Sequence, residues 1–153
     1  MLLSFYMFLE LENTAIALWV GTSLWAYPFL LSIHIVGLAI VVGIFSMRDL
    51  RLLGVFNALP ISTFSYLKNF AIAGFALNAF SGVLLFTSQA SVFVTNVPFL
   101  TKITAILIGM VLAFIIQSKL TSEIDTKTKL LALVSLACWI SAIVAGRLIA
   151  YIF

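Results

Sequence analysis

The sequence predicts an all-α integral membrane protein: a four-helix bundle with one interfacial helix at the N-terminus and another after the first span. Two observations lead to this class. The 153 residues are 64% apolar and 8% charged, whereas soluble domains are roughly 45–50% apolar and 25% charged. Mean hydropathy is +1.27, and lipid accepts such a chain where its helices satisfy their own backbone hydrogen bonds. Residues 1–153 are therefore predicted to form a single transmembrane domain.

Four segments contain the roughly 20 consecutive apolar residues that a helix needs to cross a bilayer. Helix-boundary residues separate them. Pro60 with Ser62 after it predicts one helix start. Asn96 with Pro98 after it predicts another, and the polar connector KLTSEIDTKTK precedes the last segment. The predicted spans run from about residue 24 to 47, from 64 to 87, from 98 to 117 and from 130 to 153.

Two further segments are predicted to lie along the membrane surface. Residues 5–20 carry two glutamates among aromatic side chains. Residues 48–59, RDLRLLGVFNAL, carry charges at one end and leucines on the other side, as interfacial helices do. Ser46 and Asp49 have the spacing of a capping box, with Asp in place of Glu, so a new helix is expected to start there.

The basic residues predict how the bundle is oriented. Those that flank the first and third connections outnumber the single one beside the second, and Lys and Arg gather on the cytoplasmic side. They are Arg48, Arg51 and Lys68, then Lys119, Lys127 and Lys129, against Lys102 alone. We therefore expect a multi-pass protein of the bacterial cytoplasmic (inner) membrane with both termini in the periplasm. The net charge of +3 then indicates topology and contact with membrane lipids, and it argues against a nucleic-acid partner.

The single histidine of the chain, His34, lies inside the first predicted span. An ionisable residue at that depth is costly and is a functional hypothesis by default. At about 1.5 Å per residue it lies about 14 Å below Trp25, near the bilayer centre. Asn78 is expected at a comparable depth, and two cations, Lys102 and Arg147, about one to two turns below the same surface. These residues predict a polar pocket inside the bundle.

This arrangement predicts a site for heme b. A neutral imidazole can ligate the iron, so His34 is the expected metal ligand, and basic residues above it can neutralise the propionates. The sixth ligand would be Met110 or a second His34 from a symmetric partner. Small residues would let the macrocycle approach the helices. The predicted cofactor-binding residues are His34, Met110, Arg147, Lys102, Asn78 and Gly37.

A packing role for the same residues is an open alternative. His34 can donate to a backbone carbonyl or to a serine or asparagine of a neighbouring helix. Glu10 and Glu12 can form ion pairs with the two cations, which would account for these charges without a ligand. Glycine stripes are often helix-packing seams, and Met110 can fill the core.

The remaining charged and nucleophilic residues give no catalytic set. Asp49 with its neighbouring arginines is interpreted as an interfacial charge cluster, or else as a buried Asp49–Arg pair that locks two helices together. Cys138 is the single cysteine, so neither a disulfide nor a thiolate metal cluster is expected within the chain. The sequence leaves open whether the protein is an enzyme.

Four motifs extend over nearly the whole chain: LWAYPFLLSIHIVGLAIVVGIFSMRDLRLLG, GFALNAFSGVLLF, NVPFLTKITAIL and AGRLIAYIF. They resemble successive motifs of an uncharacterised bacterial integral-membrane family, the DUF6644-type proteins. More distantly, a four-span core with a histidine in its first helix is similar to the copper-resistance CopD-like proteins and the HemJ-type protoporphyrinogen oxidases, which are associated with heme. Only His34 matches residue by residue. The other histidines of the CopD-like proteins have no counterpart here, which argues against copper transport.

The sequence thus leads to three hypotheses for function. The first is a small cytochrome b-like membrane protein that holds heme b and passes electrons to or from a quinone or a protein partner. The second is a non-catalytic accessory or scaffold subunit of a larger membrane complex or homo-oligomer, because phenylalanines and glycine seams also form interfaces. The third is a protein that binds or transports a hydrophobic ligand, quinone or lipid.

Overall fold

The structure, a computed structural model, describes residues 2–120 and 125–152, and in these ranges it consists of helices and turns. Residues 1, 121–124 and 153, which include part of the predicted polar connector and the end of the last predicted span, lie outside the described residues. The helices in chain order are α1 (Leu2–Glu12), α2 (Ala15–Thr22), α3 (Ala26–Leu52), α4 (Ser62–Thr87), α5 (Ala90–Phe93), α6 (Val97–Lys119) and α7 (Thr126–Leu148).

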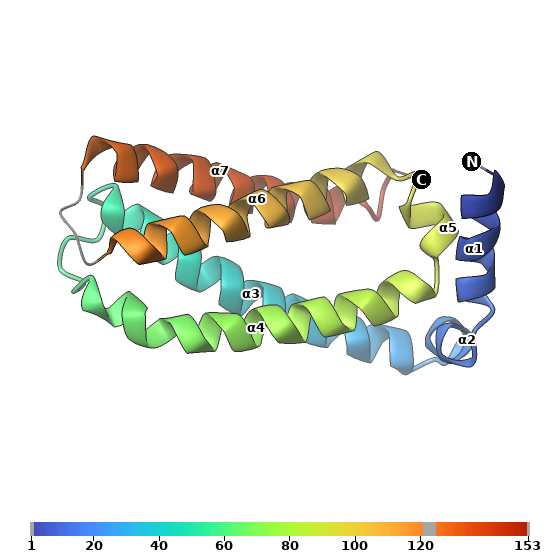
Figure 1. Cartoon of the computed structure of the whole chain (residues 1–153). Coiled ribbons are helices and arrows are strands. Elements are labelled where there is room, and N and C mark those ends of the chain that lie inside the picture. Colours follow the sequence, from blue (N-terminus) through green and yellow to red (C-terminus); the bar gives the residue numbers. More distant parts are fainter. Residues whose placement is uncertain (1, 121–124, 153) are drawn as a thin grey trace.

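Figure 1 shows four long helices side by side, with the shorter helices α1, α2 and α5 together at one end. Both chain ends lie at this same end, as an even number of spans requires (Figure 1). We call it the terminal end, and we call the opposite end, where α3 connects to α4 and α6 to α7, the loop end.

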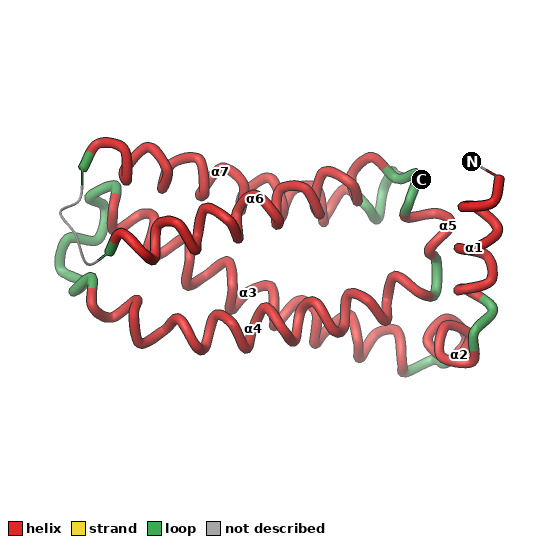
Figure 2. The backbone as a smooth tube through the Cα atoms, viewed as in Figure 1, coloured by secondary structure: helices red, strands yellow, loops and turns green. Residues whose placement is uncertain are grey.

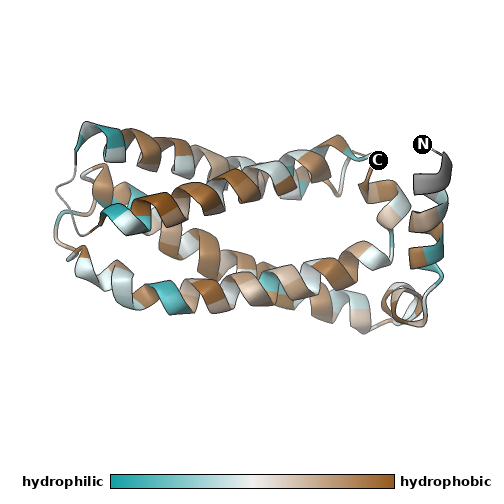
Figure 3. Cartoon of the chain, viewed as in Figure 1, coloured by the Kyte–Doolittle hydropathy of each residue, from teal (hydrophilic) through white to brown (hydrophobic). Residues whose placement is uncertain are grey.

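Four long helices, each apolar and long enough to cross a membrane, overlap the four predicted spans. α3, α4, α6 and α7 have 27, 26, 23 and 23 residues, and at about 1.5 Å per residue each exceeds the roughly 30 Å of a bilayer core. Large apolar side chains stay exposed on them, such as Phe70 at 61%, Phe80 at 66% and Val111 at 58%. Figure 3, which colours each residue by its hydropathy, shows brown apolar residues along all four long helices. Lipid covers such a surface, so the predicted class, an all-α membrane bundle, is confirmed.

The bundle is built from two helix pairs. α3 packs along α4, α6 packs along α7, and α3 also contacts α7, whereas α4 and α6 lie farther apart (Figure 1). Gly37 sits where α3 meets α4: a Cβ added to it would lie 2.7 Å from the backbone N of Asn78 and 2.8 Å from the carbonyl O of Gly74. The close approach of these two helices therefore depends on this glycine.

The prediction of a separate interfacial helix over residues 48–59 is corrected by the structure. α3 continues without a break to Leu52, and turns that Figure 2 shows in green lead from there to α4. Arg48 and Asp49 are buried, at 1% and 0% exposure, so the helix stays in the bundle instead of leaving along the surface. Gly54, with φ of 92°, then adopts the left-handed conformation that suits glycine beyond a helix end.

The N-terminal segment predicted over residues 5–20 forms two short helices instead of one. α1 ends at Glu12, and Thr14 caps α2 by accepting a hydrogen bond from the backbone N of Ala17 at 3.4 Å. α1 runs across the terminal end of the bundle (Figure 1). Glu12 Oε1 accepts from both the backbone N and the Oγ of Ser91, each at 2.7 Å, and this contact ties α1 to α5.

Candidate functional site

The imidazole of His34 lies between α3 and α4, where the α4 backbone holds one of its nitrogens. His34 Nδ1 is 2.9 Å from the carbonyl O of Asn78. A carbonyl only accepts, so Nδ1 carries the proton and Nε2 has the free lone pair. In return, Asn78 Nδ2 donates to the carbonyl O of His34 at 2.8 Å. The ring lies over Gly82, where an added Cβ would be 2.9 Å from His34 Cε1.

The second ring nitrogen of His34 faces a lysine from α6. Lys102 Nζ lies 3.2 Å from His34 Nε2, and since Nε2 has the lone pair, the lysine donates. The stem of Lys102 passes Gly146 of α7, where an added Cβ would be 3.4 Å from Lys102 Cδ. The resulting chain, Lys102–His34–Asn78, joins α6, α3 and α4 through polar atoms. We call these three residues the polar chain.

The ammonium of Lys102 has no carboxylate partner within the described part of the protein. Its one hydrogen bond there is the bond to His34, so two of its N–H groups bond to none of the described residues. The predicted ion pairs with the N-terminal glutamates do not form, because Glu12 bonds to Ser91 instead. Ser81 adds a further polar atom, with its Oγ 3.3 Å from His34 Nδ1. Sequence reasoning did not find Ser81, although it follows Asn78 by three residues on one helix face.

Four phenylalanine rings cluster between the polar chain and the terminal end. Phe86, Phe93 and Phe99 stack on one another, with ring centroids 5.1 to 6.3 Å apart. Phe8 of α1 meets the edge of Phe86 at 6.3 Å. Phe99 precedes Lys102 by three residues, so the rings lie about one turn from the polar chain. We call these four residues the phenylalanine cluster.

The other predicted cofactor residues are not brought to His34. Met110 is buried in a core cluster with Val41, Phe45 and Trp139. It follows Lys102 by eight residues on α6 and so lies about 12 Å further along the helix, which places the predicted sixth ligand at another level. Gly37 packs against the α4 backbone. The structure therefore brings three of the six predicted residues into one chain of contacts.

Arg147, the second predicted cation, also lies apart from the polar chain. It donates to the hydroxyl of Tyr151 at 2.8 Å, and its guanidinium lies over that ring, 5.2 Å from the centroid. Both side chains are exposed. No contact in the described structure joins Arg147 to Lys102 or to a glutamate.

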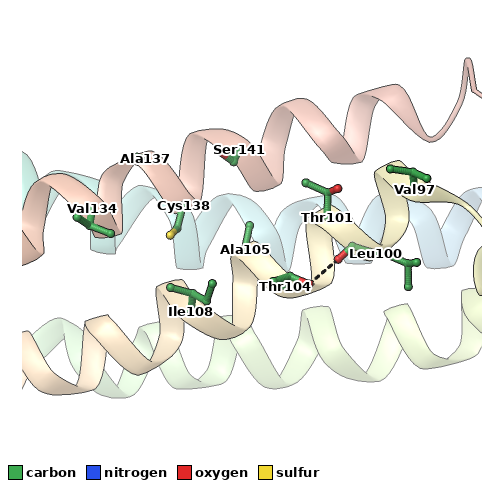
Figure 4. Close-up of a pocket in the computed structure, with 10 residues that line it drawn as sticks. All are labelled: Val97, Leu100, Thr101, Thr104, Ala105, Ile108, Val134, Ala137, Cys138 and Ser141. Atoms are coloured by element: carbon green, nitrogen blue, oxygen red, sulfur yellow. Dashed lines mark hydrogen bonds between the residues drawn. The ribbon is translucent and has the colours of Figure 1, made fainter.

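A groove of about 500 Å³ lies elsewhere, between α6 and α7. Figure 4 shows Cys138 and Ser141 of α7 on one wall and Ala105 and Ile108 of α6 on the other. Ser141 is a serine of a neighbouring helix, which is the kind of partner that the packing alternative offers to His34, and Cys138 lies about one turn from it. Their place in this groove, apart from the polar chain, excludes both as partners of the imidazole.

A second polar group is buried near the loop end, as the sequence alternative of a buried Asp49–Arg pair anticipates. Arg48 Nη2 and Asp49 Oδ1 are 2.7 Å apart, and Arg48 Nη1 donates to the carbonyl O of Ala113 on α6 at 2.9 Å. The guanidinium also lies over Phe45, 5.0 Å from the ring centroid. The pair thus connects α3 to α6.

The fold and its buried polar residues define a multi-pass α-helical membrane protein with a lysine–histidine contact inside its bundle. The chain belongs to the DUF6644 family, a family of unknown function, which matches residues 8–152. This confirms the resemblance seen in the sequence motifs. No curated protein and no solved structure matches the chain. The more distant similarity to CopD-like and HemJ-type proteins stays a prediction.

Proposed function

We propose that this protein binds a membrane quinone at the polar chain. The observation that carries the proposal is the ammonium of Lys102, which contacts His34 Nε2 at 3.2 Å inside a span and has no carboxylate partner among the described residues. A half-buried cation with unfilled donors favours a ligand that brings an acceptor oxygen, because a desolvated donor without a partner costs free energy. A quinone carbonyl is such an acceptor.

The surroundings of Lys102 support a flat, conjugated ligand. The phenylalanine cluster lies about one turn away and offers stacked aromatic faces. The apolar outer surface of the bundle gives the isoprenoid tail of a quinone a medium in which it is soluble. His34 would hold the lysine head in place, and Asn78 in turn fixes the imidazole tautomer.

The experiment is a titration of the protein in detergent with decylubiquinone, followed by quenching of intrinsic fluorescence. Lys102→Met keeps the length of the stem and removes the donor. We expect its dissociation constant to rise roughly 10- to 100-fold, the effect of losing a hydrogen bond from a charged group. Lys68→Met, at an exposed position on α4, is the matched control and should bind like the parent protein. Equal affinity of the parent and Lys102→Met would refute the proposal.

Heme b is the second candidate, and the tautomer of His34 favours it. Histidine ligands of metals commonly donate the other ring N–H to a carbonyl, as His34 Nδ1 does to Asn78. Bound heme would supply one-electron transfer. The fit is partial: Lys102 lies at the nitrogen that would ligate iron, and Met110 and Arg147 are not at the site. To free Nε2 for iron, the Lys102 ammonium would have to move away from it, and it could then pair with a propionate.

An absorption spectrum of protein purified from heme-replete cells, before and after dithionite, tests the heme candidate. A Soret band that disappears in His34→Ala would support it, and a featureless spectrum would exclude it. A protein without either ligand that keeps a tightly bound partner in native mass spectrometry would favour the accessory-subunit hypothesis.

We also propose the bacterial inner membrane as the location, with the terminal end in the periplasm. The support is the charge distribution. Arg51, Lys68, Lys119, Lys127 and Lys129 all belong to the loop end or the helix turns beside it, which is the side that the positive-inside rule places in the cytoplasm.

A further inference from the structure

The terminal end of α7 carries an arginine and a tyrosine in contact on the outer surface of the bundle. Arg147 lies in the last turn of α7, and Tyr151 follows it by four residues. Arg147 Nη2 donates to the hydroxyl of Tyr151 at 2.8 Å, and the guanidinium lies over the ring, 5.2 Å from its centroid. Both side chains are exposed, Tyr151 at 65%. The pair is therefore open to the molecules that surround the bundle at this level.

Two hydrogen bonds fix the backbone that carries Tyr151. Its backbone N donates to the carbonyl O of Leu148 at 2.9 Å. The carbonyl of the next residue, Ile152, accepts from the side-chain amide of Asn96, which caps α6. The turn after α7 is thus attached to a second helix. The tyrosine is held beside Arg147 before a ligand arrives, which lowers the entropy cost of binding.

The N–H and O–H groups that this pair leaves unused favour an anionic ligand. A guanidinium has no acceptor, and apart from the bond to Tyr151 its N–H groups bond to none of the described residues. The tyrosine oxygen accepts from Arg147, and its own O–H meets no acceptor in the described ranges. Arg147 also forms no ion pair there. Phosphate matches these donors, because a guanidinium binds two of its oxygens in parallel and a hydroxyl can bind a third.

The level of the pair in the membrane decides which phosphate is within reach. α7 has 23 residues, and at about 1.5 Å per residue it is longer than the roughly 30 Å of a bilayer core. Its last turn, which contains Arg147, therefore lies at the level of the phospholipid headgroups. Long cationic side chains near helix ends extend into this layer.

The same face of α7 continues as an apolar surface toward the middle of the membrane. Ile140 and Val144 precede Arg147 by seven and three residues, so they share its helix face. They are 54% and 53% exposed. This face thus offers donors at headgroup level and apolar side chains at the level of the acyl chains, which is the polarity of a phospholipid.

We propose that Arg147 and Tyr151 bind the phosphate of an anionic phospholipid whose acyl chains lie along Ile140 and Val144. A headgroup without an ammonium group, as in phosphatidylglycerol, suits the site because it brings no second cation to the guanidinium. This site goes beyond the proposed quinone function and does not depend on it, since no described contact joins Arg147 to the polar chain.

Native mass spectrometry of the whole protein, titrated with phosphatidylglycerol in detergent, tests the proposal. Arg147→Gln removes the charge and the parallel donors, and we expect the dissociation constant to rise about fivefold or more. Lys68→Gln is the matched control, because it removes one positive charge at an exposed position in the half of α4 nearer the loop end. It should bind the lipid like the parent protein. An Arg147→Gln protein that binds as tightly as Lys68→Gln would overturn the proposal.

Two further variants separate a phosphate site from general attraction by charge. Arg147→Lys keeps the charge and loses the parallel donors, whereas Tyr151→Phe keeps the ring and loses the O–H. We expect weaker binding in both, and the parent affinity in both would refute the site. Because the two positions are exposed, the variants should keep the parent melting temperature without lipid, which confirms that they are folded.

The choice of ligand is tested with two competitors. Phosphatidylcholine carries an ammonium group and should bind the parent protein more weakly than phosphatidylglycerol. Inorganic phosphate at millimolar concentration should not displace the lipid, because it has no acyl chains to contact α7. Equal affinity for the two lipids would exclude an anionic headgroup as the preferred ligand, and displacement by inorganic phosphate would assign the site to a free anion instead.

Discussion

Gly82 of α4 lies directly beneath the imidazole of His34, close enough that a Cβ on it would be 2.9 Å from Cε1. The ring cannot move freely, because Nδ1 is held by the Asn78 carbonyl and Nε2 faces Lys102. The contacts of the polar chain therefore require a residue without a Cβ at position 82.

Gly82→Ala is expected to displace the imidazole and to weaken both of its polar contacts. We expect the free energy of unfolding in detergent to fall by about 1–3 kcal/mol, the usual cost of overpacking, and the affinity for decylubiquinone to fall with it. Gly43→Ala is the control, because nothing lies within 4 Å of its added Cβ. It should leave the stability unchanged or raise it by up to about 1 kcal/mol. A Gly82→Ala protein as stable as Gly43→Ala would contradict this account.

Gly37→Ala is expected to be more damaging than Gly82→Ala. Its added Cβ would meet backbone atoms of α4, at 2.7 Å from Asn78 N and 2.8 Å from Gly74 O, and a backbone cannot rotate away as a side chain can. The two helices must separate, so the protein should lose stability and also the His34–Asn78 contact. Unfolding in mixed micelles, followed by circular dichroism, measures the difference between the two variants.

Removing one partner of the buried ion pair should cost more than removing both. Arg48→Met or Asp49→Leu alone leaves one buried charge without its partner, and we expect a loss of about 3–5 kcal/mol for each. The double variant Arg48→Met with Asp49→Leu should lose clearly less than the sum, because no charge is left unpaired. Additive losses in the same unfolding assay would show that the pair is not coupled.

Asp125 is expected to make α7 sensitive to acid. Its Oδ1 accepts from the side chain and the backbone N of Thr128, at 2.7 and 2.8 Å, and these bonds lower the pKa of the carboxyl below its ordinary value. A lowered pKa in the folded state means that the stabilisation is present above the unfolded pKa, about 3.9, and is lost as the pH falls through the folded value.

The measurement is the melting temperature of the parent protein and of Asp125→Ala as the pH is lowered from neutral. The parent should be the more stable protein at neutral pH, and the difference should shrink toward zero in acid. A difference that is independent of pH would assign the effect to something other than the carboxylate cap.

The orientation is tested with impermeant maleimide on intact cells. The background is Cys138→Ser, which removes the native thiol. Thr95→Cys at the terminal end should be labelled, whereas Asn57→Cys at the loop end should be labelled only after the cells are opened; both positions are exposed. The reverse pattern would place the terminal end in the cytoplasm.

The sequence by itself determined the class of protein, and it predicted four apolar segments that the four long helices overlap. The reason is physical: a bilayer demands long apolar helices, and composition and length alone report whether a chain supplies them. It also placed His34, Asn78 and Lys102 inside the bundle, because depth follows from counting residues along a helix.

Only the tertiary structure decided which of those residues meet. The depth of a residue in the membrane does not determine how its helix is rotated about its axis. The sequence therefore did not show that Lys102 faces His34 or that Arg147 contacts Tyr151. It also did not show that Met110 belongs to a separate core cluster. The end of the first span was missed for a related reason. In the sequence, the charges at residues 48 and 49 look like those of a membrane-surface segment. In the structure they are buried, because α6 and α7 cover them. Contacts between segments that are far apart in the sequence cannot be read from the local pattern of charges.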